Sequence, residues 1–305
     1  MEKIIIVGCG PAGLSAAIYA ARGGLVPLVI SGEMPGGYPT MATDIEDYPG
    51  FPNGIKGPQL SQLLKTQAEK FGTRFESGKV VSVNLSAHPF KIRTEDKTHL
   101  AQTIILATGS NPSFLGIPSE QKLIGKGVSI CATCDGPFFK GKKVVVIGGG
   151  DTALKESLYL SKIASELIII HRRDAFRAQE ALQKQIKEQK NVKFLLNSIV
   201  GEILGEQKVT GIKVEDIKTG KISQIKTDGV FIAIGHQPAT QFLKGQIELD
   251  EQGFITVNDS VKTSVEGVFA AGDVVAPKHR QIVIAAGTGA RAALEAEDYL
   301  SNLKS

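Results

Sequence analysis

The spacing of two cysteines, Cys131 and Cys134 in the segment CATCDG, is the clearest sign of chemistry in this sequence. Thiols separated by two residues can close a small disulfide and exchange it with another one. Asp135 follows directly and could carry a proton as the thiols change charge, although an aspartate there could also cap a turn. We therefore expect a redox centre here, with these three residues as its catalytic groups.

A structural zinc site is one alternative for such a pair, because closed zinc sites often contain cysteines at this spacing. Four ligands are needed, and the only other cysteine, Cys9, lies inside a glycine loop elsewhere in the sequence. The five histidines show no paired spacing. We expect no metal site, and two chemically inert cysteines are a less favoured alternative.

The segment GCGPAG near the N-terminus has the G-x-G-x-x-G spacing of a dinucleotide-binding turn and follows the apolar segment KIIIV. In such a turn the first glycine makes the bend, the second lets the backbone approach a pyrophosphate, and the third lets the helix pack on the strand. The helix that follows adds backbone donors and the positive end of its dipole. We expect a dinucleotide to bind at Gly8, Gly10, Pro11, Ala12 and Gly13.

The acidic residue that usually binds the ribose, about twenty residues after such a loop, is missing. Ser31 follows the next apolar segment, PLVI, and Glu33 lies just beyond it. Ser31 could hold the ribose more weakly, or Glu33 could reach it, and the sequence does not choose between them.

A second loop of the same kind lies near the middle of the chain, where Gly148, Gly150 and Ala153 have G-x-G-x-x-A spacing. Asp151 and Thr152 lie between the second glycine and the alanine. We expect these five residues to bind a second nucleotide.

The strand after the second loop ends in arginines rather than in an acid that would accept from a free ribose hydroxyl. Arg172 and Arg173 follow the segment ELIIIH, and Arg177 comes one helical turn later. Guanidinium groups match a 2′-phosphate in charge and geometry, so this pattern favours NADPH over NADH. A solvated basic helix start is the alternative, and His171 could either line this pocket or be a structural histidine.

Both loops belong to a repeated pattern, because residues 3–24 and 143–164 each contain an apolar strand, a glycine turn and a helical segment. Alternating strands and helices predict parallel sheets with crossover helices. We therefore expect an α/β fold with two three-layer, Rossmann-like dinucleotide-binding domains. The simplest arrangement inserts one domain, residues 117–243, into another formed by residues 1–116 and 244–305.

The composition excludes several classes of function. The chain of 305 residues has a net charge of +4 and no basic run, which gives little support for nucleic-acid binding. No apolar run approaches the length of a membrane span, and the N-terminus lacks a signal-peptide layout, so we expect a soluble cytoplasmic protein that needs no membrane. Three cysteines are too few for a secreted disulfide scaffold.

Two dinucleotide sites in one chain are typical of a flavoprotein that holds FAD at one site and takes hydride from NADPH at the other. The segment FAAGDV fits the first site, because Asp273 at a strand end could accept from ribityl hydroxyls, although it could also cap a turn. Further expected cofactor-binding residues lie in glycine turns or at strand ends: Gly37, Ala107, Thr108, Gly109, Ile234, Gly235 and Gly272.

Together these motifs resemble the low-molecular-weight thioredoxin reductases of bacteria over essentially the whole chain. The most specific motif is CATCDG between two glycine loops, and the segments DIEDYPGFP, HRRDAFRA and GVFAAGDV agree with it. The resemblance implies a homodimeric enzyme in which NADPH reduces FAD, FAD reduces the cysteine pair, and the pair reduces the disulfide of thioredoxin. It also implies that Arg280 and Gln281 help to hold FAD.

The resemblance further implies that Cys134 faces the flavin, that Cys131 attacks thioredoxin and that Asp135 acts as acid and base. Phe138 and Phe139 could belong to the thioredoxin-docking surface or to the core. Because the cysteines and the NADPH site share one domain while the flavin lies in the other, we expect the inserted domain to rotate between half-reactions.

Several positions depart from the family pattern: Tyr38 and Pro39 replace Gln-Leu, Lys155 replaces an acid, and Ala276 and His279 replace Asp and Tyr. Two other functions stay open, namely a reductase of another protein disulfide and a non-catalytic flavin redox sensor. A ferredoxin– or flavodoxin–NADP reductase would share both loops but lack the cysteine pair, which argues against it.

Overall fold

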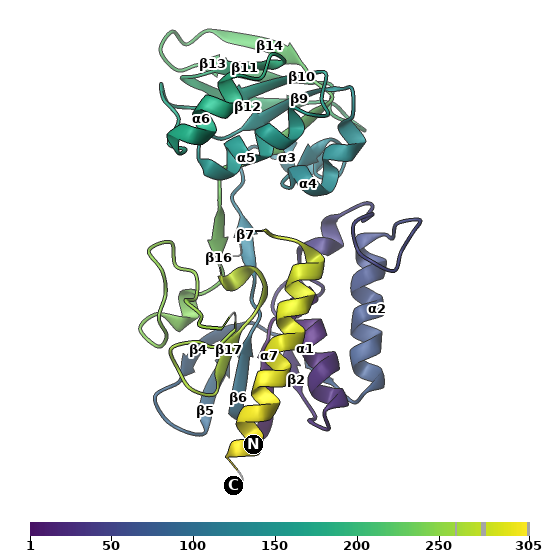
Figure 1. Cartoon of the computed structure of the whole chain (residues 1–305), viewed down its shortest axis with the longest axis vertical. Coiled ribbons are helices and arrows are strands. Elements are labelled where there is room, and N and C mark those ends of the chain that lie inside the picture. The colour runs from purple at the N-terminus through teal and green to yellow at the C-terminus, as the bar shows by residue number, and fades with distance from the viewer. Residues whose placement is uncertain (260, 276–278, 304–305) are drawn as a thin grey trace. The chain divides into compact units, whose positions relative to one another are not determined.

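The structure is a computed structural model that describes residues 1–259, 261–275 and 279–303 (Figure 1). The chain divides into two compact units. A discontinuous unit contains Met1–Asn111 and Gln237–Ser305, and an inserted unit contains Pro112–His236. No helix in the described ranges is long and apolar enough to cross a membrane.

The sheet of the discontinuous unit has a parallel part and an antiparallel part. Its strands follow the order β3-β2-β1-β6-β5-β4, and β17 also pairs with β6. The strands β3, β2, β1, β6 and β17 run parallel, whereas β5 and β4 form an antiparallel extension. Their bounds are β1 Glu2–Val7, β2 Leu28–Ile30, β3 Arg74–Glu76, β4 Val80–Asn84, β5 Phe90–Thr94, β6 Thr98–Leu106 and β17 Val268–Ala270.

Alternation along β1 divides the core of this unit between the two faces of the sheet. Ile4 and Ile6 pack with Leu14 of α1 on one face, while Ile5 and Val7 belong to the cluster on the other face. The helices α1 and α7 lie side by side over the first face (Figure 1). The helical bounds are α1 Pro11–Arg22, α2 Gly57–Lys70 and α7 Ile282–Asn302, with 3-10 turns η1 Tyr38–Met41, η3 Gln241–Leu243 and η4 Gly272–Val275.

Close packing joins α7 to the first glycine loop. A Cβ atom added to Gly289 of α7 would lie 2.0 Å from the carbonyl oxygen of Ala12. The glycine therefore lets the C-terminal helix contact the start of α1 directly, so the two ends of the discontinuous unit share one core.

The inserted unit contains a fully parallel sheet with the order β11-β10-β9-β15-β8 and a separate antiparallel sheet β12-β13-β14. The strand bounds are β8 Val128–Ser129, β9 Lys143–Ile147, β10 Glu166–Ile170, β11 Val192–Leu195, β12 Ser198–Leu204, β13 Gly211–Asp216, β14 Ile222–Lys226 and β15 Gly229–Ile232. The helical bounds are α3 Pro118–Leu123, α4 Ala132–Asp135, η2 Gly136–Phe139, α5 Asp151–Leu160 and α6 Glu180–Lys187.

The chain passes between the units through two short strands, β7 Ser110–Pro112 and β16 His236–Pro238, which pair with each other. Just beyond β7, the buried carboxylate of Glu120 accepts from the backbone N–H groups of Leu115 and Gly116, at 2.7 and 2.9 Å. A segment rich in helix breakers is thus held in place by one carboxylate.

Candidate functional site

The cysteines and the second glycine loop lie at the same edge of the inserted unit's parallel sheet. β8 ends at Ser129, two residues before Cys131, and β9 ends directly before Gly148. Both strands run parallel to β15, which lies between them. Their carboxyl ends therefore meet at one edge, about 10 Å apart at the usual strand spacing.

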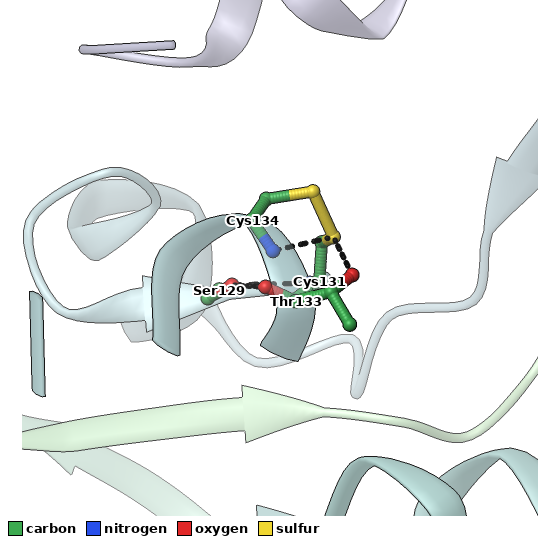
Figure 2. Close-up of a disulfide and its surroundings, with 4 residues drawn as sticks. All are labelled: Ser129, Cys131, Thr133 and Cys134. Atoms are coloured by element: carbon green, nitrogen blue, oxygen red, sulfur yellow. Dashed lines mark hydrogen bonds between the residues drawn. A yellow bond between two sulfur atoms is a disulfide. The ribbon is translucent and has the colours of Figure 1, made fainter. Parts of the chain in front are cut away.

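Cys131 and Cys134 form a disulfide with a Cα–Cα distance of 5.4 Å. Figure 2 shows two donors directed at the sulfur of Cys131: the backbone N–H of Cys134, at 3.2 Å, and the hydroxyl of Thr133, at 3.5 Å. Ser129 fixes the backbone of Cys131, since its hydroxyl accepts from the Cys131 N–H and donates to the Cys131 carbonyl. The disulfide is thus held at the start of α4, and Asp135 is the last residue of that short helix.

In the second loop, the conformation and packing of the chain require a glycine at position 148 but not at position 150. Gly148 has φ +152°, and a Cβ there would lie 2.3 Å from the carbonyl oxygen of Ala233. Gly150, by contrast, has φ −97°, and a Cβ there would meet nothing within 4 Å. Neither backbone strain nor packing accounts for Gly150, and the space above it fits a pyrophosphate that approaches the start of α5.

The other expected residues of this loop lie at the start of α5. Ala153 is fully buried and packs against Gly148. Asp151 accepts from the backbone N–H of Gln179 at 2.8 Å, and this bond anchors the segment before α6. Thr152 is the second residue of the helix. Ile234 and Gly235 follow β15 at the same edge of the sheet.

The three arginines form a positive cluster after β10. Arg172, Arg173 and Arg177 are all exposed, and within the described part of the chain none of them forms an ion pair. His171 is buried behind them, where its ring contacts Phe176 with centroids 5.7 Å apart. Burial lowers the pKa of His171, and the charges of Arg177 and Arg173 lower it further, which favours the neutral form of the ring, so the positive charge of the cluster comes from the arginines.

His171 also occupies the space beside the glycine loop, since a Cβ on Gly149 would lie 2.4 Å from Nδ1 of His171. The histidine therefore packs behind the loop.

The first loop also contains both kinds of glycine: those that the packing of the chain requires, and an open glycine, where an added Cβ would have space around it. A Cβ on Gly8, at φ +111°, would lie 2.2 Å from the Ala107 carbonyl oxygen, and one on Gly13 would lie 2.0 Å from the Gly8 carbonyl oxygen. Gly10 has φ −80°, and a Cβ there would meet only Gly37, at 3.9 Å. Gly10 is thus the open position. Pro11 begins α1, which has no side-chain cap and no acid in its first turn.

Polar groups from neighbouring parallel strands gather at the same edge of this sheet. β1, β6 and β17 are adjacent, so the first loop, the segment Ala107–Gly109 and the turn at Gly272 and Asp273 all lie at their carboxyl ends. The hydroxyl of Thr108 is buried without a hydrogen-bond partner among the described residues. Burial raises the pKa of Asp273 to about 6, against a smaller opposing effect of Arg280.

Arg280 is the residue whose charge opposes this shift, and its guanidinium lies over the ring of Phe254 at 5.6 Å. Its Nε is buried and has no partner among the described residues. A buried hydroxyl, a carboxyl of raised pKa and an unsatisfied guanidinium nitrogen fit a ligand that carries both hydroxyl and phosphate groups, as FAD does. Gln281 is the residue that precedes α7.

The contacts of Ser31 and Glu33 do not show which of the two would bind a ribose. The Ser31 hydroxyl is buried and donates to the neighbouring Gly32 carbonyl at 3.4 Å. Glu33 is exposed and pairs with Lys79 at 3.1 Å. Gly37, with φ +68°, lies against Gly10 and so borders the first loop.

The positions that depart from the family pattern have different surroundings. Tyr38 donates from its hydroxyl to Oδ1 of Asn111 at 3.4 Å, and burial raises the pKa of Tyr38. Lys155 and His279 are exposed. Ala276 lies outside the described residues.

The two adjacent phenylalanines after the disulfide have different environments. Phe139 is buried against Phe231, with ring centroids 5.2 Å apart, and belongs to the core. Phe138 is 41% exposed. Only Phe138 is therefore available to a docking protein.

Sequence reasoning missed Ser129 and Thr133, whose hydroxyls contact the backbone and the sulfur of Cys131. Both lie within two residues of Cys131, so a search for hydroxyl groups beside the cysteine pair would have found them. Among the described residues there is no group of three or more His, Cys, Asp or Glu side chains that could hold a metal ion.

A protein-family model described as pyridine nucleotide-disulphide oxidoreductase matches residues 2–289. The thioredoxin reductase of Rickettsia conorii is 48% identical over 304 residues, which cover 98% of each chain.

Two solved thioredoxin reductases align over nearly the whole chain. The crystal structure of the enzyme from Streptococcus pyogenes covers 99% of both chains at 39% identity, with a TM-score of 0.95. The structure from Lactococcus lactis, in a state named the FR conformation, covers 99% of this chain and all of its own at 37% identity, with a TM-score of 0.67.

The open glycine of the second loop gives a direct test of the nucleotide site. Gly150→Ala should leave thermal stability unchanged or slightly higher, because the added methyl meets no protein atom, and should weaken NADPH binding by about tenfold or more. Affinity is measured by titration and stability by thermal unfolding. Gly148→Ala is the matched control and should lower the melting temperature. Unaltered NADPH affinity in Gly150→Ala would contradict the assignment.

Proposed function

The chain belongs to the pyridine nucleotide-disulphide oxidoreductases, among the thioredoxin reductases of the bacterial low-molecular-weight type, and on this basis we propose how its parts divide the reaction. It is a flavoprotein oxidoreductase whose CxxC disulfide is Cys131–Cys134. The observation that carries the proposal is the placement of this disulfide at the same sheet edge as the second nucleotide loop.

In the proposal, the discontinuous unit binds FAD and the inserted unit binds NADPH. FAD in the first is supported by the open position at Gly10, by the Thr108 hydroxyl, which has no partner among the described residues, and by the half-buried Asp273. NADPH in the second is supported by the open position at Gly150 and by the three exposed arginines, which form no ion pair with any described residue. When bound, FAD takes hydride from NADPH and passes the electron pair to a disulfide.

The chain's own sulfurs then carry the electrons to the protein substrate. Two electrons and one proton convert the Cys131–Cys134 bond to a thiolate and a thiol. The Cys131 thiolate attacks a sulfur of the thioredoxin disulfide, so that bond breaks, a mixed disulfide forms and the other thioredoxin sulfur leaves as a thiolate. Cys134 then attacks Cys131, with its proton passing to Asp135, and the internal disulfide is restored as reduced thioredoxin departs.

Because the pair and the NADPH loop share one unit, the proposal requires that unit to change its arrangement between the two half-reactions. We also propose a cytoplasmic homodimer, as the resemblance implies, and the reduction of protein disulfides suits a compartment that keeps thiols reduced.

Turnover with a protein disulfide tests the proposed function. Wild-type protein should oxidise NADPH rapidly when oxidised thioredoxin from the same organism is present, and Cys131→Ser and Cys134→Ser should each abolish this turnover while NADPH still bleaches the flavin. Reduction of a glutaredoxin-like or peroxiredoxin-like protein instead would change the assigned partner. Flavin bleaching without turnover on any disulfide would support the redox-sensor alternative.

The arginine cluster predicts the choice of nucleotide. Arg172→Ala combined with Arg173→Ala should raise the KM for NADPH by about tenfold or more, because charge-assisted bonds to the 2′-phosphate are lost, and should change the KM for NADH little. Lys187→Ala, which removes an exposed charge from α6, is the matched control. Equal losses with both nucleotides would show that the arginines act on something other than the 2′-phosphate.

A further inference from the structure

The surroundings of the Cys131 sulfur are set by the backbone of this residue. Cys131 is the capping residue of α4 and has an extended backbone, φ −144° and ψ 102°. Ser129 holds it there through bonds to its N–H at 3.0 Å and to its carbonyl at 3.2 Å. The N–H of Asp135 donates to the same carbonyl at 3.1 Å. The Cα of Cys131 is thus fixed on both sides.

Fixing this backbone places the Cys131 sulfur in front of two donors (Figure 2). The N–H of Cys134 lies 3.2 Å from it, and the hydroxyl oxygen of Thr133 lies 3.5 Å from it. A disulfide sulfur carries no hydrogen, so Thr133 must be the donor in this contact. The hydroxyl is therefore already directed at the sulfur before any charge develops.

Reduction changes the strength of this contact. A disulfide sulfur is a weak acceptor, whereas a thiolate accepts charge-assisted hydrogen bonds that are shorter and roughly twice as strong as neutral ones. Donors aimed at one sulfur of a pair stabilise the negative charge on that sulfur, and the thiolate is the form that attacks a disulfide.

Resting on the proposed function, we propose that the hydroxyl of Thr133 stabilises the thiolate of Cys131 and so promotes the attack of this sulfur on the protein substrate. Thr133 contacts the reacting sulfur itself and is exposed, so it can act without any change in the core. No new redox partner is needed, because the electrons are those that already pass from NADPH to the disulfide.

Charged groups near this site stay constant when Thr133 is replaced. Asp135 belongs to α4, and the helix packed against it, α5, carries Asp151, Lys155, Glu156 and Tyr159. A difference between Thr133 variants in the titration of Cys131 therefore reports the hydroxyl.

The test measures the thiol directly, without using turnover of the flavoprotein. Three proteins are compared in a Cys134→Ser background: one that keeps Thr133, one with Thr133→Val and one with Thr133→Ser. For each protein, mass spectrometry measures the rate at which iodoacetamide alkylates Cys131 as a function of pH. Valine keeps the shape of threonine but lacks the hydroxyl, and serine keeps the hydroxyl. Thr133→Ala serves as a second variant without a hydroxyl.

The expected result is a pKa for Cys131 that is about one unit higher with valine or alanine and nearly unchanged with serine. Attack on oxidised thioredoxin at pH 7 should then slow by about threefold, because a tenfold loss of thiolate is partly offset by the greater nucleophilicity of a more basic thiolate. In a Cys131→Ser background, Thr133→Val should leave the alkylation profile of Cys134 in place.

The proposal is overturned if the Cys131 profile is the same with threonine and valine, or if serine shifts it as much as valine does. An equal shift of both cysteines would also overturn it, because the effect would then not come from the contact with Cys131. If the Cys131 profile moves as expected but the wild-type protein reduces no thioredoxin, the proposed function fails while the thiolate contact stands.

Discussion

The arrangement of this molecule depends on the backbone N–H groups at the start of a helix, which have no hydrogen-bond partner within the helix and can donate to other groups. Each of its three chemical centres lies where a parallel strand ends and a helix begins: β1 before α1, β9 before α5, and β8 before α4. The first two starts are shaped by glycines, so that a phosphate can approach the donors. At the third, the Cys134 N–H donates to the sulfur of Cys131. In our proposal, the same kind of helix start thus serves two nucleotides and a thiolate.

Parallel strands bring these helix starts together within each unit. In the inserted unit, β8, β9 and β10 end at the same edge, so the disulfide, the second loop and the arginine cluster share it. In the discontinuous unit, β1, β6 and β17 also end at one edge, which carries the first loop, Thr108 and Asp273. The consequence is a constraint on the reaction. In the proposed reaction, the site of the electron donor to the flavin and the disulfide that accepts electrons from it are carried on one sheet.

Much of this arrangement could be predicted, because glycine spacing follows from backbone geometry. Gly8 and Gly148 adopt positive φ values and press against carbonyl groups, which no other residue could do at those places. The open positions at Gly10 and Gly150 follow from the same motif. The alanine-rich segment near the C-terminus favours a helix, and α7 forms there from Ile282 to Asn302.

Other features depend on tertiary contacts that the sequence does not encode locally. Phe138 and Phe139 are adjacent and identical in type, yet only Phe139 meets Phe231 in the core. The direction of the Thr133 hydroxyl depends on the Ser129 contacts that fix the neighbouring cysteine. The ribose partner at the first site stays a choice between Ser31 and Glu33, because neither makes a bond that marks it as a ligand.

Anaerobic titration of the purified protein with NADPH, followed by flavin absorbance and by a count of free thiols, tests the central claim most directly. If one chain joins a flavin site to the Cys131–Cys134 disulfide, the wild-type protein should accept about two hydride equivalents per chain and expose two new thiols. Cys134→Ser should accept about one. A wild-type protein that saturates at one equivalent with its disulfide intact would contradict the account.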